Sequence, residues 1–312
     1  MVVFSLILVY GVIIVNGWSD SPNSIATAVS SGAIKYKTGV VLCAFFNLAG
    51  VISGYFIDTS VAKFVFTLNT STEFSHFIVC ISLFTMIVFG TVLSIIGLPS
   101  SESHSMIASM VGASFYLSQD AKYIKNLGEV FIFTVFSCIL AFAVSYLARK
   151  IFKWNLPYKR LQYLSSSLNA IMHGYQSGLK FLGVIIYLLG LNLDDKISLF
   201  PICVSIGISL FFGTLIGGKK IIESMGENLV SISDVSSFSS DIGTYLSLLI
   251  CSLMGMPVST GNVKCLSIMG VGVCEKRKIN KKTTTKLLIS FIIVFPICFF
   301  AGYFLMSLVV NF

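Results

Sequence analysis

Polar and ionisable residues gather in a few short stretches between long apolar runs, and these stretches hold the side chains that could do chemistry. The stretch GLPSSESHSMIASMVG, residues 97–112, combines hydroxyl groups with a carboxyl group and an imidazole, and it returns as GMPVSTGNVKCLSIMG, residues 255–270. In both copies Gly-x-Pro interrupts an apolar helix, and the hydroxyl residues that follow suit the start of a new one. Because free amides at a helix N-terminus favour anions, the repeat predicts an anion site between two halves of the chain.

A second pair of polar stretches recurs with nearly the same offset. NGWSDSPNSIATAVSSGAI, residues 16–34, places Asp20 and Ser21 where they can cap a helix that starts at Pro22, and its counterpart is HGYQSGLKFLG, residues 173–183. We expect the helix to break in both places. A charge at membrane depth is costly and usually functional, so Asp20 is interpreted as a cation ligand rather than only a helix cap.

Glu102 lies between Ser101 and Ser103 at the first anion-facing turn, so we predict that it takes part in the substrate site. Near neutral pH phosphate still carries a proton and sulfate does not, so an ionised Glu102 would accept a hydrogen bond from phosphate and repel sulfate. Lys180 and Lys264 lie at the same depth, where they could neutralise these acids, reach an interface or contact the anion. The sequence leaves the roles of the two lysines open.

The remaining reactive residue types do not form a recognisable reaction centre. His104 and His173 are expected to make packed hydrogen bonds, because no second His or Cys stands at metal-ligand spacing. The eight cysteines contain no CxxC pair and are interpreted as core or lipid-facing residues. No Ser/His/Asp set or paired metal ligands stand at convincing spacing, so we expect no enzyme.

The composition indicates what must hold these residues in place. The chain is 55% hydrophobic and 11% charged, with a mean hydropathy of +0.91, values typical of multi-pass helical membrane proteins. The formal net charge of +8 does not imply nucleic acid, because most of the positive charge sits in short loops between apolar runs. Residues 1–15 lack a basic start and a cleavage site, so we interpret them as a retained span.

Apolar spans follow the polar stretches in the same order in both halves, with lengths that suit a hydrocarbon core of roughly 30 Å. Candidate spans lie at residues 39–57, 128–148, 196–216 and 287–311. The expected fold is therefore all-α, a multi-pass transmembrane protein of two inverted repeats with broken and re-entrant helices. We expect a first repeat at residues 1–148, a basic cytoplasmic linker at 149–160 and a second repeat at 161–312.

Positive charge marks the expected cytoplasmic side, because short cytoplasmic loops are rich in Lys and Arg. If each motif-containing pair is re-entrant, one side receives the basic clusters at residues 35–37, 149–160, 219–220 and 276–286. The opposite side is richer in acids, among them Asp195. Both termini are then extracellular, and the plasma membrane is the expected location.

At these four stretches the sequence resembles the inorganic phosphate transporter (PiT) family of anion permeases, whose members carry G-x-N-D near each repeat start and G-x-P-x-S-T-x-H later. The match covers both halves: NGWSDSPNSIAT, GLPSSESHSMIASMVG, HGYQSGLKFLG with GTLIGGKKI following, and GMPVSTGNVKCLSIMGVG. The resemblance implies a secondary transporter that imports inorganic phosphate with a coupling Na⁺ or H⁺ and no other cofactor. By motif position, it implies cation-binding roles for Asp20, Asn23, Gln176 and Ser177. It implies substrate-binding roles for Ser101, Glu102, Ser103, Ser259 and Thr260.

The chain departs from the family pattern at several of these positions. Gln176 and Ser177 stand where Asn-Asp is usual, so one of two expected carboxylates is missing and we expect fewer coupled cations than the family norm. Glu102 stands where Thr is common, and Gly261-Asn262 stands where Thr-His is common.

Two alternatives to phosphate import remain open at this point. The family also contains sulfate carriers, so a sulfate permease of the same fold is the first alternative. An anion channel would use similar helix ends but would not need an acid such as Asp20 for coupling. The expected partners are phosphate or sulfate and the lipid bilayer, not nucleic acid, and a homo-oligomer is compatible with the pattern.

Overall fold

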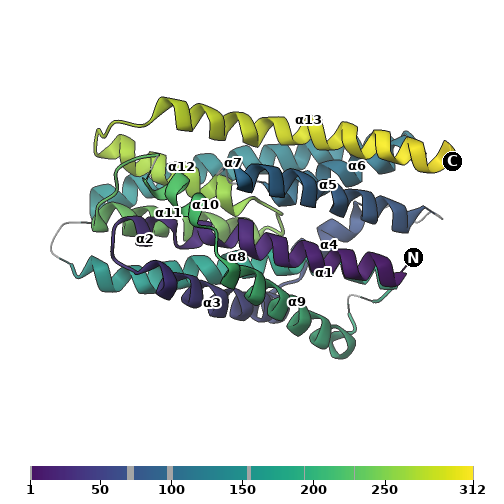
Figure 1. Cartoon of the computed structure of the whole chain (residues 1–312), viewed down its shortest axis with the longest axis horizontal. Coiled ribbons are helices and arrows are strands. Elements are labelled where there is room, and N and C mark those ends of the chain that lie inside the picture. The colour runs from purple at the N-terminus through teal and green to yellow at the C-terminus, as the bar shows by residue number, and fades with distance from the viewer. Residues whose placement is uncertain are drawn as a thin grey trace.

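The computed structural model describes residues 2–68, 74–96, 101–152, 156–192, 194–227 and 229–311, and all of its regular elements are helical (Figure 1). The first half contains α1 (Val2–Ser19), the 3₁₀-helix η1 (Ser21–Ser24), α2 (Ala26–Ser30), α3 (Tyr36–Ile57), α4 (Ser60–Thr67), α5 (Ser75–Ile95), α6 (Glu102–Ser118) and α7 (Ala121–Ile151). The second half contains α8 (Tyr158–Leu189), α9 (Lys196–Ile216), α10 (Lys219–Ile222), the π-helix η2 (Glu223–Glu227), α11 (Asp234–Leu253), α12 (Thr260–Cys274) and α13 (Lys281–Asn311).

Six segments of the described chain are long and apolar enough to cross a membrane, as expected of a multi-pass membrane protein. These segments are Val2–Ser24, Tyr36–Ile57, Ser75–Leu93, Ala121–Ile151, Ile197–Ile216 and Lys281–Asn311. The four predicted spans fall within α3, α7, α9 and α13 and are confirmed. Large apolar side chains such as Ile139 and Phe300 are exposed on the outer surface, where lipid would cover them.

The two halves pack as an inverted repeat, because equivalent helices exchange partners across the molecule. Helix α3 of the first half packs on α8, just as α9 of the second half packs on α1. At the first contact Gly174 leaves no room for a Cβ against the carbonyl oxygen of Asn47, and at the second Gly17 does the same against Leu210. Gly17 and Gly174, one from each of the two corresponding polar stretches, therefore make equivalent close helix contacts.

The predicted helix break after α11 is confirmed. Helix α11 ends at Leu253, Gly255 adopts a left-handed backbone conformation with φ of 71°, and α12 starts at Thr260. The corresponding break in the first half is only partly described, because residues 97–100 lie outside the described residues. On either side of them, α5 ends at Ile95 and α6 starts at Glu102.

The two repeat starts differ from each other, and only one of them matches the expectation. Helix α1 ends at Ser19 and η1 follows with Pro22 in its first turn, so the break around Asp20 is confirmed. The Asp20 side chain makes no capping hydrogen bond, so that part of the prediction is wrong. Helix α8 runs without interruption through residues 173–183, and the expected break there is also wrong. This stretch contains no proline, and polar residues alone do not end a helix whose backbone bonds stay intact.

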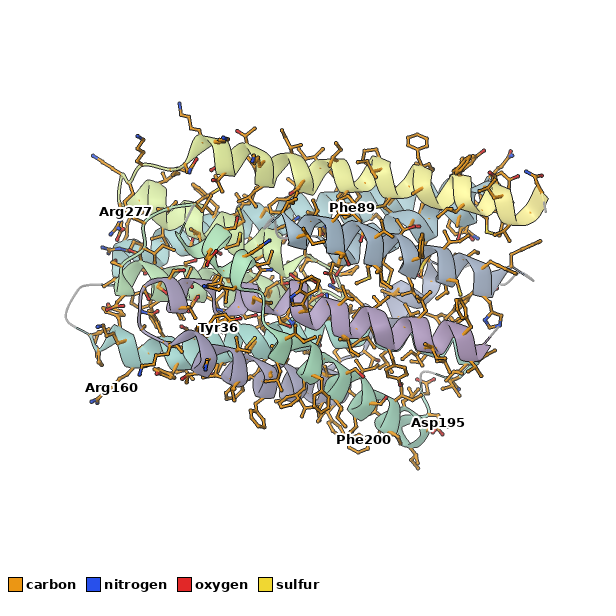
Figure 2. All side chains as sticks on the ribbon, in the orientation of Figure 1. Tyr36, Phe89, Arg160, Asp195, Phe200 and Arg277 are labelled. Atoms are coloured by element: carbon orange, nitrogen blue, oxygen red, sulfur yellow. The ribbon has the colours of Figure 1, made fainter. Side chains whose placement is uncertain are left out.

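The two ends of the helix bundle carry loops of different charge. Figure 2 shows Arg160 and Arg277 at one end and Asp195 at the opposite end, where Figure 1 also places both chain termini. The described structure thus separates the basic loops from the acidic loop and the termini, as the charge pattern predicts.

Candidate functional site

Asp20 is the centre of a polar cluster that joins the two halves of the chain. It lies at the junction of α1 and η1, and only 3% of its surface is exposed. Asn23 donates from Nδ2 to Asp20 Oδ1 at 2.8 Å, and Thr260 at the start of α12 donates from Oγ1 to Oδ2 at 3.0 Å. His173 of α8 places Nε2 3.5 Å from the same Oδ2. Three elements from different parts of the sequence therefore converge on one buried carboxylate.

The Asp20 cluster has oxygen atoms that suit a hard cation. Asn23 is 1% exposed, and its Oδ1 has no hydrogen-bond partner among the described residues. A carboxylate and a free amide oxygen side by side are ligand types that hard cations prefer. Ser177 contacts His173, with its Oγ 3.4 Å from His173 Nε2. The structure thus brings Asp20 and Asn23 together and places Ser177 behind His173.

Gln176 holds the loop before α12 through its side-chain amide. Its Nε2 donates to Ser252 Oγ at 2.8 Å and to the Met256 carbonyl at 3.1 Å, while its Oε1 accepts from the Val258 amide at 3.4 Å. These bonds use both ends of the side-chain amide. In this arrangement Gln176 positions the second break rather than adding an oxygen to Asp20.

Lys180 connects the starts of the two short helices α6 and α12. It is 3% exposed, and its Nζ donates to Ser103 Oγ at 2.7 Å and to the Val258 carbonyl at 2.8 Å. Ser103 belongs to the first turn of α6, and Val258 comes just before the N-cap of α12. Helix N-termini and an ammonium group all attract negative charge, so this junction has the electrostatics of an anion site.

Ser101 and Ser259 occupy the N-cap positions of these two helices. Ser259 accepts from the Asn262 amide at 3.4 Å and so caps α12 directly. Ser101 instead bonds His104 Nδ1, and His104 Nε2 lies 2.9 Å from the hydroxyl of Thr134. Both residues fix the shape of their turns, and Ser101 also anchors α6 to α7.

Glu102 is buried against the end of α1. It is 1% exposed, accepts from Asn16 Nδ2 at 2.7 Å, and accepts a second hydrogen bond from the Ser19 hydroxyl. Gly90 of α5 faces the same carboxylate, and a Cβ at that position would lie 3.1 Å from Oε1. Glu102 therefore links the first turn of α6 to the residues that precede Asp20.

The two histidines make packed hydrogen bonds, as expected. His104 bridges Ser101 and Thr134, while His173 Nδ1 lies 2.9 Å from Asn47 Oδ1. Within the described part of the chain no group of three or more His, Cys, Asp or Glu residues is arranged to hold a metal ion.

Sequence reasoning missed several polar residues that complete this region. Asn47 donates to Ser21 Oγ at 2.9 Å and to Thr214 Oγ1 at 3.1 Å, so it ties α3 and α9 to the first break. Asp241 of α11 is fully buried and pairs with Lys264. The signal for Asn47 was present in the sequence, because an amide group stands within an otherwise apolar helix.

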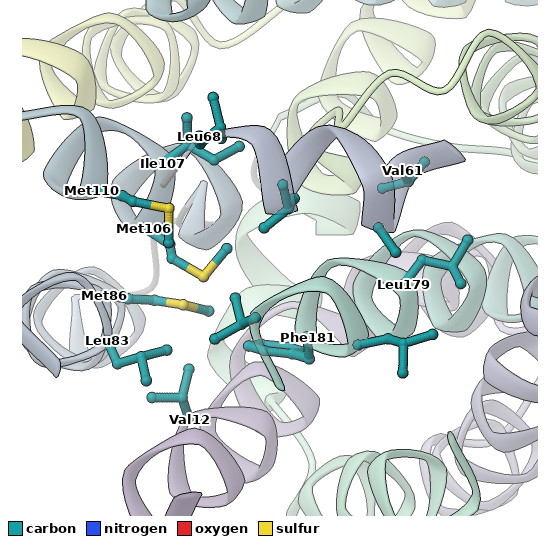
Figure 3. Close-up of a cluster of buried hydrophobic side chains, with 14 of the residues drawn as sticks. Val12, Val61, Leu68, Leu83, Met86, Met106, Ile107, Met110, Leu179 and Phe181 are labelled. Carbon is teal, nitrogen blue, oxygen red and sulfur yellow. The ribbon is translucent and has the colours of Figure 1, made fainter. Parts of the chain in front are cut away.

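An apolar core closes the side of the site that faces the chain termini. Figure 3 shows buried side chains from α1, α4, α5, α6 and α8 meeting there. The labelled members are Val12, Val61, Leu68, Leu83, Met86, Met106, Ile107, Met110, Leu179 and Phe181. Along α1 the chain reaches Val12 before Asp20, and along α6 it reaches Met106 after Glu102, so these parts of the core lie between the site and the termini, while Leu179 and Phe181 flank Lys180 itself.

A cavity of about 250 Å³ borders the site at the end of α1. Its lining includes Trp18 and Ser19 together with Lys219 and Lys220 of α10. Both lysines are exposed, whereas Ser19 is buried and bonds Glu102. The cavity therefore leads from a basic surface toward the polar cluster.

Comparison with known proteins identifies the family. The model of the phosphate transporter family matches the chain twice, over residues 16–157 and over residues 153–302. The chain belongs to the phosphate transporter family. The two matches in tandem agree with the inverted repeat of the fold.

Bacterial proteins described as transporters are similar to this chain over most of its length. A probable low-affinity inorganic phosphate transporter of Bacillus subtilis is 27% identical over 95% of this chain and 94% of its own length. A protein of the same description from Rhizobium meliloti is 26% identical over 92% of both chains. The sulfate permease CysP of Bacillus subtilis is 25% identical over 83% of this chain and 73% of its own length.

A solved structure supports the fold independently. The structure described as the sodium-dependent phosphate transporter superimposes with a TM-score of 0.84 and covers 99% of this chain and 98% of its own. At 17% identity, this likeness establishes the arrangement of the helices.

Proposed function

We propose that the protein is a secondary active transporter that imports inorganic phosphate together with a cation, Na⁺ or H⁺. The observation that carries the proposal is the convergence of the α6 and α12 N-termini on Lys180, next to the buried carboxylate of Asp20. Anion-attracting helix ends and a cation-attracting acid at one place are what symport of an anion with a cation requires. The family and the transporters similar to this chain support phosphate as the anion.

Phosphate would bind between the two helix starts. Lys180 supplies positive charge from the second half, and Ser103 and Thr260 supply hydroxyl groups from α6 and α12. The ammonium now donates to Ser103 and to a backbone carbonyl, and a phosphate oxygen is a stronger acceptor than either. Ser101 and Ser259 hold the two turns in shape, so their backbone amides can also face the anion.

Thr260 offers a physical route by which the cation and the anion bind together. Its hydroxyl group has one proton, and that proton is donated to Asp20 Oδ2 in the described structure. A cation at Asp20 would compete for the same carboxylate oxygen and leave the hydroxyl free to donate to phosphate. Binding of each ion then favours binding of the other, and this coupling is reciprocal.

A sulfate permease of the same fold is the second candidate, and the likeness to CysP supports it. Glu102 favours phosphate, because a carboxylate at the first turn would meet an unprotonated anion with like charge. In the described conformation this carboxylate accepts hydrogen bonds from Asn16 and Ser19, which hold it against α1. An anion channel is less well supported, because a channel has no use for Asp20 as a coupling acid.

The direct test is uptake of radiolabelled phosphate and sulfate into proteoliposomes with Na⁺ and proton gradients imposed separately. A carrier of the proposed kind shows saturable phosphate uptake that one of the gradients drives uphill. Stronger uptake of sulfate than of phosphate would replace the substrate assignment. Uptake that neither saturates nor responds to a gradient would support a channel instead.

We also propose that the protein lies in the plasma membrane with the basic loops in the cytoplasm and both termini outside. The apolar core then closes the site from outside, while the cavity beside Lys219 and Lys220 approaches it from the cytoplasm. Single cysteines at Asp195 and Lys281, in a background without reactive native thiols, should label from opposite sides with an impermeant reagent. Labelling of both from one side would contradict this orientation. A homo-oligomer stays a proposal that cross-linking in the membrane can test.

A further inference from the structure

A further buried acid lies on α11, and the transport mechanism above does not use it. Asp241 of α11 is completely buried, and Lys264 of α12 is 1% exposed. The two side chains form an ion pair between Lys264 Nζ and Asp241 Oδ1. Lys264 also donates to Thr27 Oγ1 of α2 at 2.8 Å.

The acid that holds the Lys264 ammonium is itself surrounded by polar side chains. Thr27 donates to Asp241 Oδ1 at 2.8 Å, Ser165 donates to Asp241 Oδ2 at 2.6 Å, and Asn169 donates to the Asp241 carbonyl at 3.2 Å. Asn169 Oδ1 is buried without a hydrogen-bond partner among the described residues. Carboxylate, hydroxyl and amide oxygens of this kind are the ligand types that a free Na⁺ ion would find at Asp20.

The position of the pair gives it the same connectivity as the Asp20 site. Thr27 follows the first break, as Asn23 does, and Lys264 lies one helical turn after Thr260 on α12. Two links therefore join the segment after the break to α12. One runs from Asp20 to Thr260, and the other runs from Thr27 and Asp241 to Lys264.

Stability alone does not explain an ion pair at this depth. Removing two charges from water is costly, and a buried pair often adds no more stability than apolar residues of the same size. The fixed ammonium neutralises the buried Asp241 carboxylate, as a cation bound at Asp20 would neutralise that acid.

We propose that Lys264 is a built-in cation, held by Asp241, Thr27 and their neighbours in a site that would otherwise bind a small monovalent cation from solution. The link between α2 and α12 at this point is then permanent, whereas the link at Asp20 depends on a transported ion. As far as it concerns the number of transported cations, this inference rests on the proposed function. This protein then transports fewer cations per anion than a transporter that binds a cation from solution at this site, because Lys264 takes the place of that cation.

The test compares two truncations of the lysine in a chain that also carries Asp20→Asn, so that the first cation site is removed. Lys264→Ala leaves the oxygen atoms and a space for an ion, whereas Lys264→Met fills that space with apolar atoms. The unfolding midpoint of each purified protein is measured against Na⁺ concentration, with choline holding the ionic strength constant. A ligand that binds only the folded state raises the midpoint as its concentration rises, so the Lys264→Ala protein should gain stability with Na⁺ while the Lys264→Met protein should not.

Further variants keep this test decisive. Lys264→Ser adds an oxygen atom and serves where Lys264→Ala does not fold, and Asp241→Asn combined with Lys264→Ala should abolish the response to Na⁺. In chains that keep Asp20, Lys264→Ala should make phosphate uptake depend more steeply on Na⁺. Equal responses of the Ala, Ser and Met proteins to Na⁺ would overturn the proposal. The stability measurement uses no phosphate, so a failure of the transport assignment would leave its result intact.

Discussion

The starts of the two repeats occupy equivalent places in the fold but contribute different groups to the site. In the first half α1 ends at Ser19, and the buried turn that follows presents Asp20 and Asn23 to the centre of the molecule. In the second half α8 continues through the same place and presents His173 and Lys180 from intact helical turns. The first start thus supplies a carboxylate at a broken helix, and the second supplies an imidazole and an ammonium on a rigid one.

This difference indicates that the two halves bind different ions. A broken helix leaves backbone and side-chain oxygens free to surround a cation, whereas an unbroken helix can offer only side chains. Lys180 and His173 both point toward groups of the other half, namely Ser103 and Asp20. We infer that the first repeat binds the cation and that the second repeat carries the charge that attracts the anion.

The largest expected effect comes from removing the acid that only the first start has. Asp20→Asn should abolish uphill phosphate uptake, because an amide cannot balance a cation's charge and cannot carry a proton. Proteoliposomes with an imposed Na⁺ or proton gradient provide the measurement, and Glu129→Gln, on the half-exposed surface of α7, is the matched control. Normal concentrative uptake by the Asp20→Asn protein would show that the first repeat does not couple transport through Asp20.

Removing the ammonium of the second start should have the next largest effect. Lys180→Met keeps the length of the side chain but loses two charge-assisted hydrogen bonds, and we expect phosphate affinity to fall by roughly 10- to 150-fold. Lys125→Met, at an exposed position of α7, controls for the loss of one positive charge. Phosphate binding by the purified protein, measured at equilibrium, reports the change. Equal affinities in the two variants would mean that Lys180 only ties α6 to the second break.

Glu102 tests whether the first half also helps to choose the anion. Because its carboxylate already receives hydrogen bonds from Asn16 and Ser19, we expect Glu102→Gln to shift the preference for phosphate over sulfate by about 5-fold, the effect of one polar contact. Competition of labelled phosphate uptake by sulfate across a range of pH gives the value. An unchanged preference at every pH would restrict Glu102 to its structural link with α1.

The smallest expected effect sharpens the comparison by making the two starts more alike. Ser177→Asp adds an acid beside His173, at the place where the family usually has one. We expect phosphate uptake to continue and to depend more steeply on the coupling cation. The dependence of the initial uptake rate on cation concentration measures this, and Ser177→Asn controls for the change in size. Identical dependence in the two variants would show that the second start cannot take a cation.

The sequence predicted the spans, the inverted repeat and the break after α11, because these depend on local composition and on Gly-Pro geometry. The continuous course of α8 was missed, since polar residues such as Gln176 and Ser177 look the same in a break and in a helix that bonds its neighbours. The role of Lys180 was left open because both of its partners lie more than 70 residues away in the sequence, with separations of 77 and 78. Asp241 was missed because α11 is rich in serine and its carboxyl group does not stand out there, although its ion-pair partner Lys264 stands only 23 residues away.

The central claim is that a cation at Asp20 and an anion at the α6 and α12 helix starts bind cooperatively through Thr260. Equilibrium binding of labelled phosphate to the purified protein, measured as a function of Na⁺ concentration and of pH, tests it most directly. The account predicts that raising the concentration of the coupling cation strengthens phosphate binding in the unmodified protein and that Asp20→Asn and Thr260→Val each remove this effect. Phosphate affinity that stays the same at every Na⁺ concentration and every pH would contradict the account.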